Sequence, residues 1–257
     1  MGTSITFGKR GYLHVGVRRV AARQALLWLA RGWEDLRATR AASLAHGALI
    51  CALGAVLLMV GSTHPYLIAA AVTGYLLVGP IMTTGIVELS RRRTLREPCS
   101  FDESLSAASR NPEGLFHFGG ILALIALLWF TASTVLLTAT LHLAVPSLAV
   151  TMWGGAREFA DLREASAYLA SGALLAIAVF ALSVIAVPLI IDRHATAGEA
   201  MTNSVRVALH NIPAMIVWAA LIAGLTAVGF LTALLGMIVI APLLGHATWH
   251  AYRDLAH

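Results

Sequence analysis

Long stretches without a charged side chain are the feature that most constrains this fold. From residue 207 to residue 252 the chain contains no Asp, Glu, Lys or Arg. A helix needs about 20 apolar residues to cross the hydrocarbon core of a bilayer. As one helix, this stretch would be roughly 69 Å long at 1.5 Å per residue. We therefore expect it to fold back within the membrane, with the turn between Gly224 and Gly229.

The composition agrees with a membrane location. Charged residues make up 12% of the chain and hydrophobic residues 58%, and the mean hydropathy is +0.79. A soluble domain of ordinary composition has about 25% charged residues. A soluble enzyme is therefore excluded. The two cysteines, Cys51 and Cys99, are too few for a disulfide framework or a four-cysteine zinc site.

The charge-free stretches predict six membrane spans. Four of them cover residues 43–61, 66–89, 115–141 and 168–191, the fifth begins at Pro213 and the sixth ends near His250. Short loops rich in Lys and Arg stay in the cytoplasm. With both termini inside, Arg157 and Arg163 are the two basic residues left outside. We therefore expect a bacterial inner-membrane protein with both termini in the cytoplasm.

An internal repeat appears at an offset of 100 residues. Its first copy contains Ser104, Leu105, Ala108 and Asn111, which recur as Ser204, Val205, Ala208 and Asn211. Each copy is a short amphipathic stretch that leads to an Asn able to cap the next helix and to an early proline, Pro112 or Pro213. The N-terminal region is a third and weaker copy, with an apolar stripe at Ala22, Leu26, Leu29, Trp33 and Leu36.

The predicted fold is an all-α polytopic membrane protein of three hairpins. The second helix of each hairpin carries a proline, at Pro80, Pro188 and Pro242. Each unit contains an even number of spans, so successive units keep the same orientation. The result is a parallel pseudo-threefold repeat about an axis along the membrane normal. Each hairpin is preceded by an amphipathic helix on the cytoplasmic surface of the bilayer.

These units divide a single integral membrane domain over residues 1–257. Residues 1–40 form a cytoplasmic or interfacial N-terminal helix and residues 43–95 the first hairpin. Residues 100–192 contain the second interfacial helix and hairpin, with a periplasmic insertion at 142–166. Residues 196–257 contain the third interfacial helix and hairpin.

Ionisable groups near the bilayer are the default candidates for a functional site. Glu88, Asp192 and His246 follow the three prolines toward the cytoplasmic ends of their helices. If the repeats superpose, these three groups and Arg193 form one polar cluster. The alternative is structural pairing, in which Glu88 contacts Arg91 or Arg92 on its own helix and Asp192 contacts the neighbouring Arg193.

A second candidate site is the pair His246 and His250, four residues apart on one helix face. That spacing suits a metal ion or a haem iron. The alternative is an interfacial anchor or a cap at the helix end. No cofactor is predicted, and haem or metal remains a further hypothesis.

The sequence lacks the motifs of nucleophilic catalysis, metalloproteases and phosphate-binding loops. No enzymatic activity is expected. The basic residues Arg91 to Arg96 and the net charge of +5 are explained by anionic lipid headgroups. The expected partners are therefore the lipid bilayer and another membrane complex, with no nucleic acid.

Three segments carry a resemblance to a known family. They are residues 32–36 (GWEDL), residues 79–92 with Gly79-Pro80 and the run GIVELSRR, and residues 242–255 (PLLGHATWHAYRDL). In these segments the chain resembles the DUF2189 family of predicted bacterial integral membrane proteins. The resemblance implies location more than activity. Some members of that family carry the label of cytochrome c oxidase subunits.

Three functions are compatible with these features. The first is a non-catalytic accessory or assembly protein of the inner membrane, associated with a respiratory complex. The second is a small-solute or ion carrier with a cytoplasm-facing cavity. The third is a haem- or metal-binding membrane protein. A polar cavity between the proline-bearing helices would favour the carrier, and a filled axis would favour the accessory protein.

Overall fold

The computed structural model describes residues 12–63, 79–141 and 162–257. The first half of this part contains α1 (Gln24–Ala38), α2 (Arg40–Thr63), α4 (Thr84–Leu95), α5 (Phe101–Leu105) and α6 (Ala107–Arg110). The second half contains α7 (Pro112–Leu141), α9 (Leu162–Ser183), α10 (Ala186–Arg193), α11 (Ala197–His210), α12 (Ile212–Leu231) and α13 (Met237–Leu255). The described residues form helices and connecting loops, with one isolated β-bridge between Val17 and Ala256. The predicted all-α class is confirmed.

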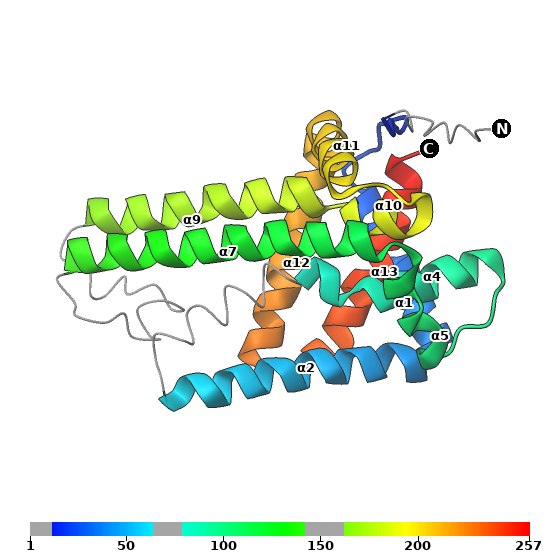
Figure 1. Ribbon diagram of the computed structural model, residues 1–257, viewed down its shortest axis with the longest axis horizontal. Helices are drawn as coiled ribbons and strands as arrows, with labels where there is room; N and C mark the ends of the chain where they lie inside the picture. The colour runs from blue at the N-terminus through cyan, green and yellow to red at the C-terminus, as the bar shows by residue number, and fades with distance from the viewer. Residues whose placement is uncertain (1–11, 64–78, 142–161) are drawn as a thin grey trace, which may run out of the picture.

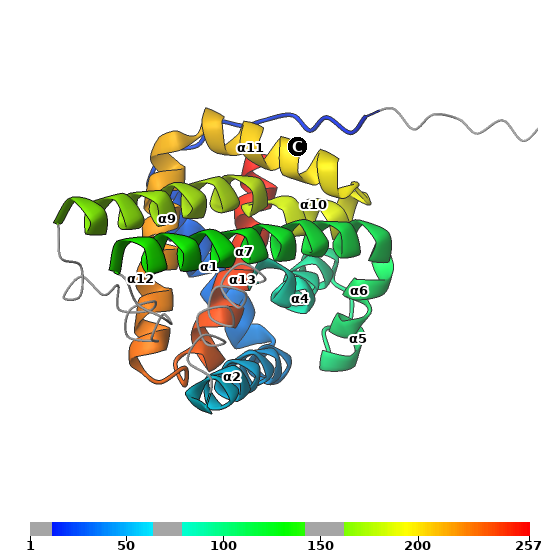
Figure 2. The ribbon, with the colours of Figure 1, turned by 60° about the vertical axis from the view of Figure 1, so that its left-hand side comes forward.

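The long helices run in two directions. α7 and α9 lie side by side along the long axis of the molecule, and α2 runs in a similar direction below them (Figure 1). α12 runs across this direction in both views (Figures 1 and 2). α13 packs against α12, α2, α4 and, most extensively, α1. A Cβ on Gly32 of α1 would lie 2.8 Å from the backbone nitrogen of Ala247, so this glycine permits the close approach of α1 to α13.

Four stretches of the described helices are long and apolar enough to cross a membrane. They are Arg40–Leu57, Pro112–Trp129, Ala170–Arg193 and Ile212–Leu231. They coincide with the first, third, fourth and fifth predicted spans. A membrane protein is therefore supported, whereas the prediction of six spans is supported only in part.

The other two predicted spans have different outcomes. Most of the second predicted span, residues 66–89, lies outside the described residues. Residues 142–161 of the predicted periplasmic insertion also lie outside them. The sixth corresponds to α13, which is not among the four candidate spans. The second half of α13 carries His246, His250, Arg253 and Asp254, so its apolar part is too short to cross the hydrocarbon core.

The turn before α13 lies later than predicted. α12 continues to Leu231, so Gly224 and Gly229 are both helical. The turn uses Ala233 and Leu234, whose φ angles of 51° and 69° are left-handed. A Cβ on Gly229 would clash with the Met237 sulfur, so this glycine serves the packing of the hairpin and not its turn.

The two predicted asparagine caps behave differently. The Asn111 side-chain oxygen accepts a hydrogen bond from Gly114 N at 3.0 Å, which caps α7 as predicted. Asn211 precedes α12, but its side chain makes no cap hydrogen bond. Its oxygen instead accepts from Val20 N at 2.9 Å, and its amide nitrogen donates to Arg18 O at 3.1 Å. This part of the prediction is wrong because a distant segment occupies the Asn211 side chain.

That segment, residues 12–20, runs in an extended conformation along α11. Asn203 accepts from Val15 N at 3.2 Å and donates to Leu13 O at 2.7 Å. Glu199, one turn earlier on the same helix, accepts from Leu13 N at 2.7 Å. The bridge between Val17 and Ala256 then joins the segment to the end of α13. The N-terminal region is therefore more than an interfacial helix.

The prolines mark two helix breaks. α9 ends at Ser183, and Pro188 lies in the first turn of α10, where a missing N–H needs no helical partner. A second break lies at Thr83, three residues after Pro80. Pro242 lies inside an unbroken α13. The breaks orient α4 and α10 toward α13, with which both make contact.

Candidate functional site

The imidazole of His246 lies at the centre of a buried polar cluster. Its helix, α13, packs between α1, α2 and α4, and the residue is 0% exposed. Nε2 lies 2.8 Å from the Ser43 hydroxyl of α2, and Nδ1 lies 2.7 Å from the Ser90 hydroxyl of α4. One side chain therefore connects three helices that are far apart in the sequence.

Asp35 of α1 supplies the negative charge of this cluster and is 4% exposed. Its carboxylate accepts hydrogen bonds from Ser90 at 2.5 Å and from His250 at 2.9 Å, and it pairs with Arg93. Burial alone would raise the pKa of Asp35, but the hydrogen bonds from His250 and Ser90 outweigh this effect and hold the pKa below its ordinary value. Asp35 is therefore a carboxylate at neutral pH.

The charge of Asp35 determines the direction of the neighbouring hydrogen bonds. A carboxylate only accepts, so the Ser90 hydroxyl donates its proton to Asp35. The Ser90 oxygen must then accept from the Nδ1–H group of His246. In the neutral imidazole, Nε2 is left to accept a hydrogen bond from Ser43. The Ser43 hydroxyl also lies 2.9 Å from the Thr39 hydroxyl, so its one proton has two possible acceptors. The charge of Asp35 therefore favours the Nδ1–H tautomer of His246.

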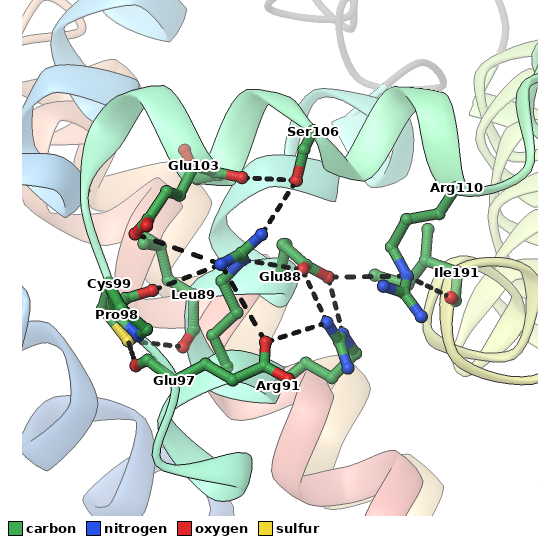
Figure 3. Close-up of polar contacts among 12 residues, drawn as sticks. Glu88, Leu89, Arg91, Glu97, Pro98, Cys99, Glu103, Ser106, Arg110 and Ile191 are labelled. Atoms are coloured by element: carbon green, nitrogen blue, oxygen red, sulfur yellow. Dashed lines mark hydrogen bonds and ion pairs between the residues drawn. The ribbon is translucent and has the colours of Figure 1, made fainter.

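Glu88 of α4 lies in a second cluster and is 0% exposed. Arg91 donates two hydrogen bonds to its carboxylate, at 2.7 and 2.8 Å, and Arg92 donates a third at 3.0 Å. Arg110 of α6 approaches to 4.0 Å and also donates to the Ile191 carbonyl at 2.8 Å (Figure 3). The hydrogen bonds to Glu88 raise the pKa of Arg91 above its ordinary value. This cluster joins α4, α6 and α10.

Asp192 and Arg193 meet a different residue. The hydroxyl of Tyr252 donates to Asp192 at 2.6 Å and accepts from Arg193 Nε at 3.2 Å. Burial and the contact with Asp192 raise the pKa of Tyr252 above its ordinary value. These contacts attach the end of α10 to the last turn of α13.

The predicted polar cluster is therefore divided into three parts. Glu88 contacts arginines of its own helix, Asp192 contacts Tyr252, and His246 contacts two serines. The alternative of structural pairing describes Glu88 correctly. Asp192 and its neighbour Arg193 are linked through a tyrosine hydroxyl. No hydrogen bond or ion pair joins Glu88, Asp192 and His246 to one another, and all three lie in the described part of the chain.

The predicted metal pair, His246 and His250, is engaged by protein groups. Both ring nitrogens of His246 face serine hydroxyls, and Nε2 of His250 faces Asp35. Within residues 12–63, 79–141 and 162–257, no group of three or more His, Cys, Asp and Glu side chains is arranged to hold a metal ion. A metal at this pair would have to displace these partners.

A fourth carboxylate, Asp254, holds α1 against the end of α13. It accepts hydrogen bonds from Gln24 at 2.6 Å and from Trp28 at 2.9 Å, and it forms an ion pair with Arg31 at 3.1 Å. These three donors lie on one side of α1, at helical spacings of four and three residues. Asp254 therefore fixes how α1 is rotated about its own axis.

Sequence reasoning missed Asp35, Ser43 and Ser90 as members of a cluster. The inward side of α1 consists of Ala25, Trp28, Gly32, Asp35 and Leu36. A signal was present, because Asp35 shares the helical period of Trp28 and Gly32. The predicted apolar stripe used Leu26 and Trp33, which the structure places on the exposed side.

Comparison with protein families agrees with these structural findings. Residues 67–192 match the family model DUF2189, described as a predicted integral membrane protein. This confirms the resemblance inferred from the sequence. Residues 79–92 lie inside the matched range, whereas residues 32–36 and 242–255 lie outside it. No curated protein and no solved structure matches the chain.

Proposed function

We propose that this protein is a non-catalytic accessory or assembly protein of the bacterial inner membrane, a rigid element that supports a membrane complex such as a respiratory one. The observation that carries this proposal is the saturation of its buried polar groups. Glu88 has its arginines, Asp35 has Ser90, His250 and Arg93, and His246 has two serines. In the described ranges, every buried side-chain nitrogen or oxygen has a hydrogen-bond partner.

A carrier or a proton pathway makes a different demand on such groups. Ionisable residues that bind and release a substrate must exchange partners during each cycle, so at least one of them faces a ligand or water. Here the carboxylate of Glu88 receives three hydrogen bonds from its own helix. Releasing it would take the buried counter-charge from Arg91 and Arg92 and leave them only the more exposed Glu97 and Glu103. This cost favours a permanent structural role.

The order in which the helices pack supports a threefold arrangement of the three units. α5 and α6 pack on α4, α11 packs on α9 and α10, and α1 packs on α13. In each case the short helix that begins one unit contacts the helix that ends another, and the contact of α1 with α13 closes the ring. Capping boxes at Ser100–Glu103 and Thr196–Glu199 start the second and third units in the same way. We propose this pseudo-threefold repeat, with both termini cytoplasmic.

The test is to extract the full-length protein from native membranes in a mild detergent and to determine its mass and composition by native mass spectrometry. The accessory role predicts a stoichiometric membrane-protein partner and no haem absorbance. Flux is measured in parallel on protein reconstituted in liposomes. A solute or proton flux that Glu88→Gln abolishes, while the exposed control Glu97→Gln keeps it, would replace this proposal with the carrier.

A further inference from the structure

The outward side of α1 combines exposed apolar and basic side chains. Leu26 is 54% exposed, Leu27 46% and Trp33 44%. The exposed arginines in or beside the helix include Arg19, Arg23, Arg37 and Arg40. None of these four arginines forms an ion pair with another described residue, whereas Arg31, at the edge of the inward side, pairs with Asp254. Glu34 is the one exposed acidic residue of α1.

Contacts at both ends of α1 fix which of its side chains are exposed. Asp254 holds Gln24, Trp28 and Arg31 on the inward side, and Trp28 also packs edge-to-face against Trp218 of α12 at 5.9 Å. Asp35 holds the last turn through Ser90 and His250. A helix fixed at both ends cannot rotate to hide Leu26 or Trp33. The apolar and basic face therefore stays on the surface.

The short helices of the second unit do not share this character. α5 exposes Leu105, which is 52% exposed, but also Asp102. Neither α5 nor α6 contains a tryptophan, and their one arginine, Arg110, is turned toward Glu88 and Ile191. An anionic surface would attract α1 and gain little from α5. The charge pattern thus distinguishes α1 from α5 and α6.

We propose that the outward face of α1 binds the anionic lipid headgroups of the membrane surface, with Leu26, Leu27 and Trp33 inserted at headgroup depth. Arginine forms charge-assisted hydrogen bonds with phosphate. Tryptophan favours the membrane–water interface. Each basic residue near an anionic leaflet contributes about 1 kcal/mol, which corresponds to about five-fold in affinity. This interaction is independent of the accessory role proposed above.

The experiment places an environment-sensitive fluorophore on a single cysteine at Ala30, in the middle of the face, after Cys51 and Cys99 are changed to Ser. The matched control carries the label at the exposed Ser109 of α6. Both proteins are full-length and reconstituted in nanodiscs of phosphatidylcholine, with or without about 30% phosphatidylglycerol. The expected result is a blue shift at Ala30 that requires phosphatidylglycerol and is reversed by salt, with no such change at Ser109.

The arginines are tested by titrating short-chain phosphatidylglycerol into the labelled protein in a neutral detergent. The double variant Arg23→Gln and Arg37→Gln should bind about 25-fold more weakly, from about five-fold per residue. The control Arg96→Gln, an exposed arginine after α4, should change affinity less than about two-fold. A circular dichroism spectrum equal to that of the unchanged protein establishes that the double variant is folded.

Two results would overturn the proposal. A blue shift that is the same in both lipid compositions would mean that the face has no preference for anionic headgroups. A shift that grows with protein concentration in detergent, without added lipid, would assign the face to contact with a second copy of the chain.

Discussion

α7 has a buried inward side and an exposed outward side. Phe118 and Leu122 on the inward side are 0% exposed, whereas Phe116 on the outward side is 78% exposed and Leu127 and Leu128 are each 60% exposed. α9 and α10 differ along their length, with Leu174 and Ile177 of α9 exposed and Leu189 of α10 buried. We call the packed region around α1, α4, α10, α13 and the inward side of α7 the base, and the outward residues Leu127, Leu128, Leu174 and Ile177 the far ends.

The base and the far ends contain different kinds of residue. The carboxylate clusters around Asp35, Glu88, Asp192 and Asp254 all lie in the base. The described far ends contribute exposed leucine and isoleucine, which suit lipid. Base residues determine which helices meet, and far-end residues determine only that the helices remain in the bilayer. This difference can be tested by matched substitutions.

The largest expected effect is that of Glu88→Gln. The substitution removes the buried counter-charge of the nearly buried Arg91, which keeps only the partly exposed Glu97 at 3.4 Å, and breaking a buried pair in this way costs about 3–5 kcal/mol. The free energy of unfolding in detergent, measured by denaturant titration, gives this value. Glu97→Gln is the control, because its 41% exposed side chain should cost less than about 1 kcal/mol. Equal losses in the two variants would contradict a special role for burial at Glu88.

The second prediction compares two positions of α7 directly. Phe118→Ala opens a cavity in the base and should cost about 3–5 kcal/mol. Leu128→Ala removes a side chain that faces away from the protein and should change stability by less than about 0.5 kcal/mol. Both values come from the same unfolding titration. A large loss at Leu128 would mean that the far ends are packed against protein in the membrane.

The third prediction concerns the link between His246 and Ser90. Ser90→Ala and His246→Ala each leave a buried partner unsatisfied, so the double variant should lose less than the sum of the single losses. A coupling of about 0.5–3 kcal/mol is expected from the four proteins of a double-mutant cycle. A control cycle that combines His246→Ala with Thr131→Ala, at an exposed position of α7, should give additive losses. Additivity in the first cycle would mean that the 2.7 Å contact carries no energy.

The smallest expected effect is a pH dependence carried by Asp35. Its pKa is lower in the folded protein than its ordinary value of 3.8, so the folded state favours the charged form. The stability that this contributes is present above about pH 4 and is lost as the pH falls through the folded pKa. Asp35→Asn should remove this part of the acid destabilisation, measured as the change in unfolding free energy between neutral and acid pH. Parallel profiles for the two proteins would contradict it.

The membrane helices were the easier part to predict from the sequence. A long charge-free stretch is sufficient evidence for a membrane helix, and α2, α7, α9 and α12 follow from it directly. The pairing of Glu88 with Arg91 and Arg92 was also accessible, because residues three and four apart meet on a helix. These features depend on neighbours in the chain.

The base could not be predicted to the same degree. Asp35 lies 55 positions from Ser90 and 215 from His250, and no local pattern indicates which distant helix a carboxylate will meet. The same is true of Asn211, whose local position indicates a cap but whose side chain binds residues 18 and 20. Convergence of Glu88, Asp192 and His246 stays a prediction, because each of the three makes its hydrogen bonds to another partner.

The pairing of α1 with α13 has a consequence for the time course of synthesis. The contact between Gln24 and Asp254 joins residues 230 positions apart. At a synthesis rate of about 5–20 residues per second, α1 leaves the ribosome roughly 10 to 50 s before its partner. During that interval the inward side of α1, with Trp28 and Asp35, has no α13 to cover it. α1 can therefore reach its final packing only after α13 has been synthesised. Any chaperone or lipid surface that shields the inward side of α1 acts in this interval.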